Sequence, residues 1–330
     1  MDTDWNIEKL LNVSNGYWKG CAVQAAVRLG IFSHIGSSSL SCKEVADRAE
    51  TDNRATEMLL DALAAIKLLN KIDCRYANTK FAATYLQRQS PEYMGHIILH
   101  HHHLLDGWAQ LDTAVTQGTP IQKRSYGEET ERQSFLMGMF NLAMGIAPEI
   151  AEQIDLGGRK HLLDLGGGPG TYAIHFCMAN PQLQATIFDR PTTRPFAEQT
   201  IKSFGLSERI SFAGGDFTSD AIAGGPYDAA WLSHILHSNG SEQCYAILEN
   251  TVAQMDSGGI IFIHDFILDD SRDSPEFAAL FSLNMLINNP RGRSYSEGEI
   301  RSMMKAAGIS AIARHPYTGH NDSSILFGVV

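Results

Sequence analysis

The feature that most constrains the fold of this chain is a glycine-rich loop that directly follows an apolar run, within residues 162–176. The apolar run ends at Asp164, and four of the six residues that follow it are glycine, before a helical pattern begins. Two later strand-like runs end in acidic residues, Asp189 and Asp216. A strand, a glycine loop, a helix and then strands that end in carboxylates is the order in which an α/β sheet binds the adenosyl part of a cofactor.

The sequence of the loop separates two classes of cofactor. A dinucleotide site needs the pattern G-x-G-x-x-G, with a helix N-terminus beneath the pyrophosphate. Here the loop reads G-G-G-P-G, and Pro169 removes a backbone N–H donor and stiffens the turn. Such a loop suits a ligand that has no phosphate groups, and S-adenosylmethionine (SAM) is a ligand of that kind. The loop therefore predicts SAM binding and methyl transfer rather than hydride transfer.

Composition excludes several classes of partner. With 330 residues and 44% hydrophobic content, the chain has room for two globular domains. Its net charge of -11 disfavours nucleic acid and anionic membranes, because phosphate binding depends on Lys and Arg. No stretch approaches the roughly 20 apolar residues of a membrane span, and the acidic N-terminus lacks the apolar core of a signal peptide. The five cysteines are scattered without a C-x-x-C pair, which favours reduced thiols and a cytoplasmic location.

Residues 1–90 have the pattern of a winged-helix domain, mainly helical and ending in a short hairpin. An amphipathic helix is predicted from residue 10 to Gly30, a residue typical of helix ends. Ser41 has a glutamate three residues later, which indicates a capping box, and another helix opens at Thr51 or Asp52. Residues 70–79 then predict a small β wing.

A winged helix can either bind DNA or serve as a dimerisation module, and charge distinguishes the two. Residues 1–95 contain 11 Lys or Arg and 11 Asp or Glu, so this part of the chain carries no net positive charge. A domain that reads DNA should be basic. We therefore predict a homodimerisation domain with no nucleic-acid partner and no membrane partner.

Residues 91–153 are predicted to be a helical connector that contributes to a substrate pocket. They contain four adjacent histidines, and His96, His100 and His103 share one helix face by their spacing. Three interpretations stay open: a metal site, histidines such as His101 that line a substrate cavity, and histidines that are merely packed or solvated. No acidic or cysteine partner is placed to complete a metal site, so no metal is predicted.

From residue 154 to residue 330, strand-like and helix-like segments alternate, which predicts a doubly wound, mostly parallel sheet. The last two of the seven strand candidates are separated by little more than residues 316–322, too short for a right-handed crossover. The final strand should therefore be antiparallel. Seven strands with one reversed at the C-terminus form the methyltransferase variant of a Rossmann-like sheet.

Ligands of open α/β sheets bind at the carboxyl ends of the strands, so the polar residues there are the candidates for SAM binding. Asp189 can accept both ribose hydroxyls and Asp216 the adenine amine, although either aspartate could instead cap a helix. Phe217 offers a stacking face beside Asp216, and Ser233 could hold the methionine carboxylate. Gly166 and Gly168 let the backbone come close to the methionine portion of SAM. The predicted cofactor-binding residues are Asp164, Gly166, Gly168, Asp189, Arg190, Gly215, Asp216, Phe217 and Ser233.

A candidate general base follows the fourth predicted strand. His237 comes just after that strand, and a neutral imidazole there can take the proton of a phenol or enol as it attacks the sulfonium methyl. Asp265, at the end of the next strand, can orient His237 by a hydrogen bond. His234 falls at the end of the strand itself and is interpreted as structural.

These motifs together resemble the class I SAM-dependent O-methyltransferase family, which includes plant caffeate and flavonoid enzymes and hydroxyindole O-methyltransferase. The resemblance is carried by D-L-G-G-G-P-G, the F-D after the second strand, G-G-D-F, W-L-S-H-I-L-H and a distal G-R and Y-S, and it covers essentially the whole chain. It implies a homodimer through the winged-helix domain, SAM in the C-terminal domain, His237 as general base and Asp265 as its support.

The chain departs from the family pattern on the substrate side. Ser238 and Asn239 follow the base where the family usually has Asp-Trp, and Ser294 is the best match for a second glutamate of plant members. Acceptor identity is therefore not carried over. Transfer to N, S or C, a different reaction of bound SAM, and a SAM-sensing winged-helix regulator are the alternatives. The predicted walls of the acceptor pocket are Phe135, Met139, Met144, His101, Phe281, Met285 and Asn289.

Overall fold

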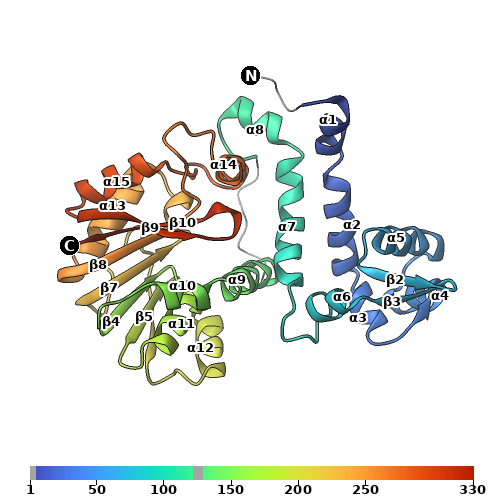
Figure 1. The fold of residues 1–330 in the computed structure, drawn as a ribbon, viewed down its shortest axis with the longest axis horizontal. Coiled ribbons are helices and arrows are strands. Elements are labelled where there is room, and N and C mark those ends of the chain that lie inside the picture. The colour runs from blue at the N-terminus through green and yellow to red at the C-terminus, as the bar shows by residue number, and fades with distance from the viewer. Residues whose placement is uncertain (1–4, 122–128) are drawn as a thin grey trace. The chain divides into compact units, whose positions relative to one another are not determined.

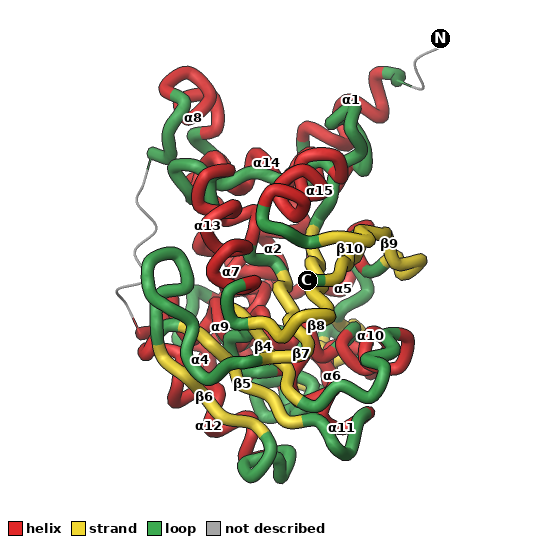
Figure 2. The backbone as a smooth tube through the Cα atoms, turned by 90° about the vertical axis from the view of Figure 1, so that its left-hand side faces the viewer, coloured by secondary structure: helices red, strands yellow, loops and turns green. Residues whose placement is uncertain are grey.

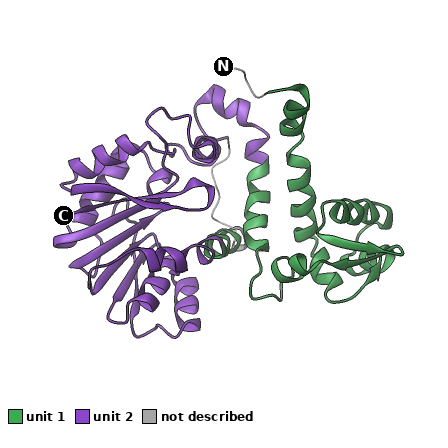
Figure 3. Ribbon diagram, in the orientation of Figure 1, with its two compact units in different colours: residues 1–105, 129–141 green, residues 106–128, 142–330 purple. Residues whose placement is uncertain are grey.

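The computed structural model describes residues 5–121 and 129–330. The described chain forms two compact units, which Figure 3 draws in different colours. The first contains the residues up to 105 together with 129–141, and the second contains the rest. The segment predicted as a connector, residues 91–153, is thus divided between the units, with boundaries inside the helices α7 (Gly95–Trp108) and α9 (Glu129–Met144).

The first unit is mainly helical and contains a small antiparallel sheet of three strands in the order β1-β3-β2 (Figure 1). Ser41 forms the predicted capping box with Glu44, and the Asp52 side chain caps the next helix. The β2–β3 hairpin is the predicted wing. The elements here are α1 (Ile7–Ser14), α2 (Tyr17–Arg28), α3 (Ile31–Ile35), β1 (Leu40–Ser41), α4 (Cys42–Ala49), α5 (Asn53–Ala65), β2 (Leu69–Ile72), β3 (Arg75–Asn78) and α6 (Lys80–Tyr85).

The single helix predicted from residue 10 to Gly30 is wrong, because the segment forms two helices. α1 ends at Ser14, and the break falls at Asn15 and Gly16, two residues with low helix propensity. The Asn15 N–H closes the last turn of α1 by donating to the Leu11 carbonyl. Gly30 ends the second helix as predicted, with a left-handed φ of 68° that favours glycine.

The second unit is built on a seven-stranded sheet in the order β6-β5-β4-β7-β8-β10-β9 (Figures 1 and 2). The strands from β6 to β8 pair in parallel, and β10 is antiparallel to both of its neighbours, as the short final connection predicts. The strands are β4 (His161–Leu165), β5 (Gln184–Asp189), β6 (Ile210–Gly214), β7 (Tyr227–Ser233), β8 (Met255–Asp265), β9 (Ser310–Thr318) and β10 (Ser324–Val329).

Helices cover both faces of this sheet, so most side chains of its central strands are apolar and buried. Residues of α10, α11 and α12 pack with Trp231 on one face, whereas α13 and α15 pack with Leu232 on the other. The helices of this unit are α8 (Leu111–Gln117), α10 (Ala147–Gln153), α11 (Thr171–Ala179), α12 (Arg194–Ser203), α13 (Ser241–Val252), α14 (Glu276–Asn288) and α15 (Glu297–Ala306).

Strand order decides which loops lie near one another. Because β4, β7 and β8 are parallel neighbours, their carboxyl ends lie at one edge of the sheet. The glycine loop follows β4, His234 and His237 follow β7, and Asp265 ends β8. The sheet therefore brings the predicted cofactor loop and the predicted base to the same edge.

No single helix among the described residues is long and apolar enough to cross a membrane. One bent pair, residues 132–144 with 147–153, meets that criterion by length and composition alone.

Candidate active site

The glycine loop after β4 fits closely between the ends of neighbouring strands. Gly166 and Gly168 have left-handed φ values of 65° and 55°. A Cβ at Gly166 would collide with Ile235, and it would also press on Phe217. A Cβ at Gly168, by contrast, would meet no described atom within 4 Å. Glycine at these positions thus lets the loop pack tightly on one side and keeps its other side free of side chains.

Asp189 ties this loop to the end of β5. Its carboxylate accepts hydrogen bonds from the backbone N–H of Gly168 at 2.8 Å and of Arg190 at 2.6 Å. Burial raises the pKa of Asp189, and the backbone N–H donors of Arg190 and Gly168 oppose that rise. The carboxylate does not cap a regular helix here, which was the alternative to a ribose-binding role.

The end of the neighbouring strand β6 holds further predicted cofactor residues, Gly215 and Asp216, with Arg190 close to Asp216. The Arg190 guanidinium lies 4.0 Å from the Asp216 carboxylate. Asp216 also accepts hydrogen bonds from the backbone N–H and hydroxyl of Thr218, which hold its pKa below the usual range. Gly215 packs against the Phe188 ring and donates its N–H to the Asp189 carbonyl at 3.0 Å. The carboxylates of Asp189 and Asp216 thus belong to one connected region after β5 and β6.

Asp164 lies beneath the glycine loop, fully buried. Its Oδ2 accepts a hydrogen bond from the Ala173 N–H at 3.1 Å, and its Oδ1 has no hydrogen-bond partner among the described residues. Burial raises the pKa of Asp164 to about 7, and the neighbouring Asp189 carboxylate adds to this. An unpartnered, buried carboxylate oxygen below the loop is a ready acceptor for a polar group or a water molecule.

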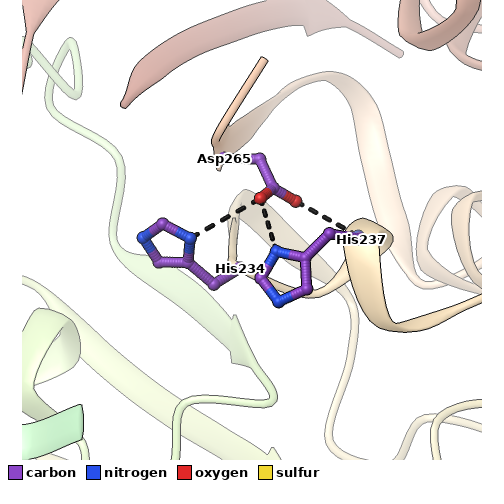
Figure 4. A group of neighbouring side chains, drawn as sticks. All are labelled: His234, His237 and Asp265. Atoms are coloured by element: carbon purple, nitrogen blue, oxygen red, sulfur yellow. Dashed lines mark hydrogen bonds and ion pairs between the residues drawn. The ribbon is translucent and has the colours of Figure 1, made fainter. Parts of the chain in front are cut away.

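A short contact at this edge joins the two residues predicted to act together. His237 Nδ1 lies 2.6 Å from Asp265 Oδ1, and the His237 backbone N–H donates to Asp265 Oδ2 at 3.3 Å (Figure 4). Both residues are more than nine-tenths buried. The short contact places a proton on Nδ1, so Nε2 is left as the acceptor when the ring is neutral.

Asp265 is ionised in spite of its burial. Burial alone would raise the pKa of this carboxyl group, but the imidazoles of His237 and His234 more than offset that effect and hold the pKa well below its usual range. The Phe266 backbone N–H also donates to Asp265 Oδ1, at 2.8 Å. The carboxylate is therefore a fixed negative charge beside the His237 ring.

His234 is a member of this group that the sequence did not identify as functional. Its Nδ1 lies 3.5 Å from Asp265 Oδ1, the same oxygen that His237 Nδ1 contacts (Figure 4). His234, His237 and Asp265 also offer potential metal ligand atoms within 4.8 Å of one another. Ligand atoms bound about 2.0–2.1 Å from one tetrahedral zinc ion lie about 3.3 Å apart. The 2.6 Å contact between His237 and Asp265 is instead the geometry of a hydrogen bond.

The hydroxyl of Ser233 contacts a buried histidine, and its predicted contact with the methionine carboxylate stays a prediction. Ser233 Oγ lies 2.9 Å from Nδ1 of the fully buried His264, whose Nε2 lies 3.1 Å from the Ser323 hydroxyl. His264 directly precedes Asp265, and its polarity inside an apolar strand was the signal that could have revealed this network. Burial holds the pKa of His264 well below its usual range, so it stays neutral.

The predicted acceptor-pocket residues fall on both units, so whether all seven line one pocket stays a prediction. In the second unit, the Phe281 ring stands edge-on to His237 with centroids 4.8 Å apart, and Met285 is buried. His175 Nε2 lies 3.4 Å from the Met144 sulfur. In the first unit, the Phe135 ring packs on His100. Met139 and His101 also belong to that unit, and Asn289 belongs to the second.

The polar atoms of Asn289 and Ser294 form hydrogen bonds that hold loops in place. The Asn289 side chain donates to the Ser238 carbonyl and accepts from the N–H groups of Arg291 and Gly292. Ser294 is buried, and its hydroxyl donates to the Ala278 carbonyl at 2.7 Å. Asn289 thus secures the turn that contains His237, and its place in the acceptor pocket stays a prediction.

Comparison with known proteins identifies the family of this chain. An O-methyltransferase domain profile matches residues 101–310, and an O-methyltransferase dimerisation domain profile matches residues 11–88. The chain is 32% identical to the 3-hydroxy-5-methyl-1-naphthoate 3-O-methyltransferase of Streptomyces sahachiroi, over 97% of this chain and 94% of the relative. The chain belongs to the O-methyltransferase family.

Two further relatives of this O-methyltransferase family member show how much the family varies. The chain is 29% identical to the N,N-dimethyltransferase OxyT of Streptomyces rimosus, over 91% of this chain and 90% of the relative. The structure of PigF, a protein known from a Serratia species, was solved with S-adenosylhomocysteine (SAH) and has a TM-score of 0.90 at 25% identity. That match covers 99% of this chain and all of the other. The family is SAM-dependent, and the open side of Gly168, the Asp189 carboxylate and the free oxygen of Asp164 fit such a cofactor.

We expect the affinity for SAM to depend on Asp189. Replacing Asp189 by Ala should weaken SAM binding by about 1–3 kcal/mol, because charge-assisted hydrogen bonds from the ribose are lost. Isothermal titration calorimetry measures this directly, with Glu198→Ala on the exposed surface as control. Unchanged affinity in Asp189→Ala would remove this residue from the cofactor site, and tight binding of NAD would contradict the interpretation of the loop.

The raised pKa of Asp164 predicts a pH-dependent stability. Since its folded pKa is about 7 and the unfolded value is about 4, the native state holds the proton more tightly, and this group's contribution to stability falls as pH rises from 4 to 7. The loss is at most on the order of 4 kcal/mol. Urea unfolding without added SAM at pH 5 and pH 8 should show Asp164→Asn gaining stability relative to the wild type as pH rises.

The control is Asp256→Asn, which changes an exposed carboxylate. Its stability should run parallel to that of the wild type across the same range. Parallel curves for Asp164→Asn as well would show that Asp164 is ionised in the folded state at pH 5.

Proposed function

We propose that this protein transfers the methyl group of SAM to a hydroxyl of a small aromatic or enolic molecule, with His237 as the general base. When bound, SAM supplies an electrophilic methyl group on a positively charged sulfur. The acceptor oxygen forms a bond to the methyl carbon while the carbon–sulfur bond breaks, and the hydroxyl proton passes to His237 Nε2. The products are the methyl ether, SAH and an imidazolium that later returns its proton to solvent.

The observation that carries this proposal is the 2.6 Å contact between His237 Nδ1 and Asp265 Oδ1. It fixes the ring orientation and leaves Nε2 free to accept a proton. The Asp265 charge then stabilises the imidazolium that forms, as the third group does in other base-assisted reactions. A buried, oriented base of this kind gives little advantage to an amine or thiolate, which attacks without losing a hydroxyl proton.

The surroundings of His237 support an aromatic acceptor. Three phenylalanine rings, Phe266, Phe277 and Phe281, pack on one another next to this residue, with centroids 4.7 to 6.0 Å apart. Phe266 lies parallel to the His237 ring and Phe281 stands edge-on to it. Flat apolar side chains beside a base favour a flat, weakly acidic ring over a polar aliphatic alcohol. One relative is named as a naphthoate O-methyltransferase and another as an N,N-dimethyltransferase. Which atom of the acceptor receives the methyl group is therefore a question for experiment.

Loss of the base should lower turnover without loss of the cofactor. We expect His237→Ala to reduce kcat by about 10²–10⁴-fold on a weakly acidic phenol, while SAM affinity is nearly unchanged. Asp265→Asn should reduce kcat less, because the ring remains but is poorly oriented. His161→Ala, on an exposed histidine at the opposite end of β4, is the matched control. Near-normal turnover of His237→Ala would mean that transfer needs no base here and would favour N- or S-methylation.

We also propose that the chain functions as a homodimer through its first unit. α1 has no buried residue, although it carries Ile7, Leu10, Leu11 and Val13, and these are 57–79% exposed. Trp18, on the neighbouring helix α2, is 62% exposed. So many large apolar side chains on two consecutive helices need a covering surface, and a second copy of the chain supplies one by symmetry. The dimerisation-domain match at residues 11–88 overlaps these helices.

Light scattering tests this assembly. We expect a mass near twice the 36.2 kDa of one chain at micromolar concentration. Leu11→Glu should shift the mass toward that of one chain, because a charge in the interface is costly. Ile72→Glu, a change on an exposed apolar residue of the wing, should leave the dimer intact. A wild-type mass of one chain would contradict the proposal.

A further inference from the structure

His234 has an unusual backbone conformation at the end of β7. Its φ of 57° is left-handed, a conformation that residues other than glycine adopt infrequently, although histidine adopts it more often than most. The His234 N–H is held by the His264 carbonyl of the adjacent strand at 2.8 Å. Strained conformations of this kind are kept where a side chain must point in a particular direction. The direction here is toward Asp265 (Figure 4).

The His234 ring lies against the same carboxylate oxygen as the base. His234 Nδ1 is buried and has no hydrogen-bond partner among the described residues, and Asp265 Oδ1 is 3.5 Å away. A nitrogen lone pair would be repelled by a carboxylate oxygen, so the proton of a neutral His234 belongs on Nδ1. At this distance the N–H acts on Asp265 mainly through electrostatics, because a full hydrogen bond is shorter.

Few other ionisable groups face this pair. From β8, Asp265 and His264 contact it, and from α13 the buried Cys244 lies near Asp265. Tyr172 of α11 and Tyr317 of β9 pack on His264. Burial raises the pKa of both tyrosines and of Cys244, so all three stay uncharged, as does His264. Among the described neighbours, Asp265 and the two histidines therefore carry the charge that decides protonation here.

We propose that His234 is a positioning residue that shares Asp265 with His237 and thereby keeps the base in its neutral, proton-accepting form. This inference rests on the proposed role of His237. A neutral His234 partly satisfies the Asp265 charge through its N–H, which weakens the pull of that charge on a His237 imidazolium. A protonated His234 would repel a second imidazolium directly, with centroids only 5.7 Å apart. Both effects favour a neutral His237.

Substitution of His234 should therefore make His237 harder to deprotonate. His234→Phe keeps a ring between His264 and Phe266 but removes the N–H. We expect it to raise the titration midpoint of His237 by about 0.5–1 pH unit, a size typical of one neighbouring polar group. The acidic limb of the kcat/KM profile should move by the same amount, while SAM affinity and turnover above that limb stay near wild type.

His234→Asn is the second variant, because Asn tolerates a left-handed φ and its amide can still donate to Asp265. It should shift the midpoint in the same direction by a smaller amount, and it keeps the inference testable if the Phe variant fails to fold. His161→Phe, on the exposed start of β4, should shift nothing. The midpoint is read in full-length protein by NMR of histidine labelled with ¹³C at Cε1, with the His237 signal assigned from His237→Asn.

The NMR reading separates this inference from the proposed function, because it needs no turnover. An unchanged His237 midpoint in a folded His234→Phe or His234→Asn protein overturns the inference, as does a drop in kcat with an unmoved pH profile. A raised midpoint in a protein whose His237→Ala variant still turns over normally would support the sharing of Asp265 and overturn the role of His237 as base.

Discussion

The parallel pairing of β7 with β4 on one side and β8 on the other is the constraint on which the site depends. Leu165 pairs with Leu232, and Ser233 pairs with His264, so the three strands end at nearly the same level. A shift of one residue would turn every side chain of a strand to the other face. Because β7 is buried on both faces, such a shift would expose apolar side chains, and the register is held by the core rather than by the polar site.

Burying a polar group costs free energy unless it has partners, so the partners of the buried polar groups at this edge indicate what each group does. An ionised carboxylate in the interior is tolerated only when donors surround it. Asp265 meets this condition with two backbone N–H groups and the His237 ring, whereas Asp164 has one backbone donor and one oxygen without a partner. The charge of Asp265 is therefore stabilised by groups of the protein itself. Asp164 instead leaves one oxygen open to a water molecule or to a polar group of a ligand at the loop.

The sequence was sufficient for the architecture because its signals were periodic and ordered. Alternating strand and helix patterns predicted all seven strands and the reversed last strand, and the capping box at Ser41 was confirmed. The break at Asn15 was missed because the apolar stripe continues across it. The contacts of His234, Ser233 and Asn289 could not be predicted, because each partner is distant in the sequence. The partners are Asp265, His264 and Ser238, which lie 31, 31 and 51 residues away. Local patterns carry no information on such distant contacts.

The central claim is that His237 removes the acceptor's hydroxyl proton, and a series of phenols of graded acidity tests it most directly. Single-turnover rates are measured for wild type and His237→Ala at one pH with SAM saturating. The loss caused by the substitution should be large for phenols that remain protonated at that pH, and it should shrink toward none for phenols that are already ionised. A loss that is equally large across the whole series would contradict a base role and would assign His237 to positioning alone.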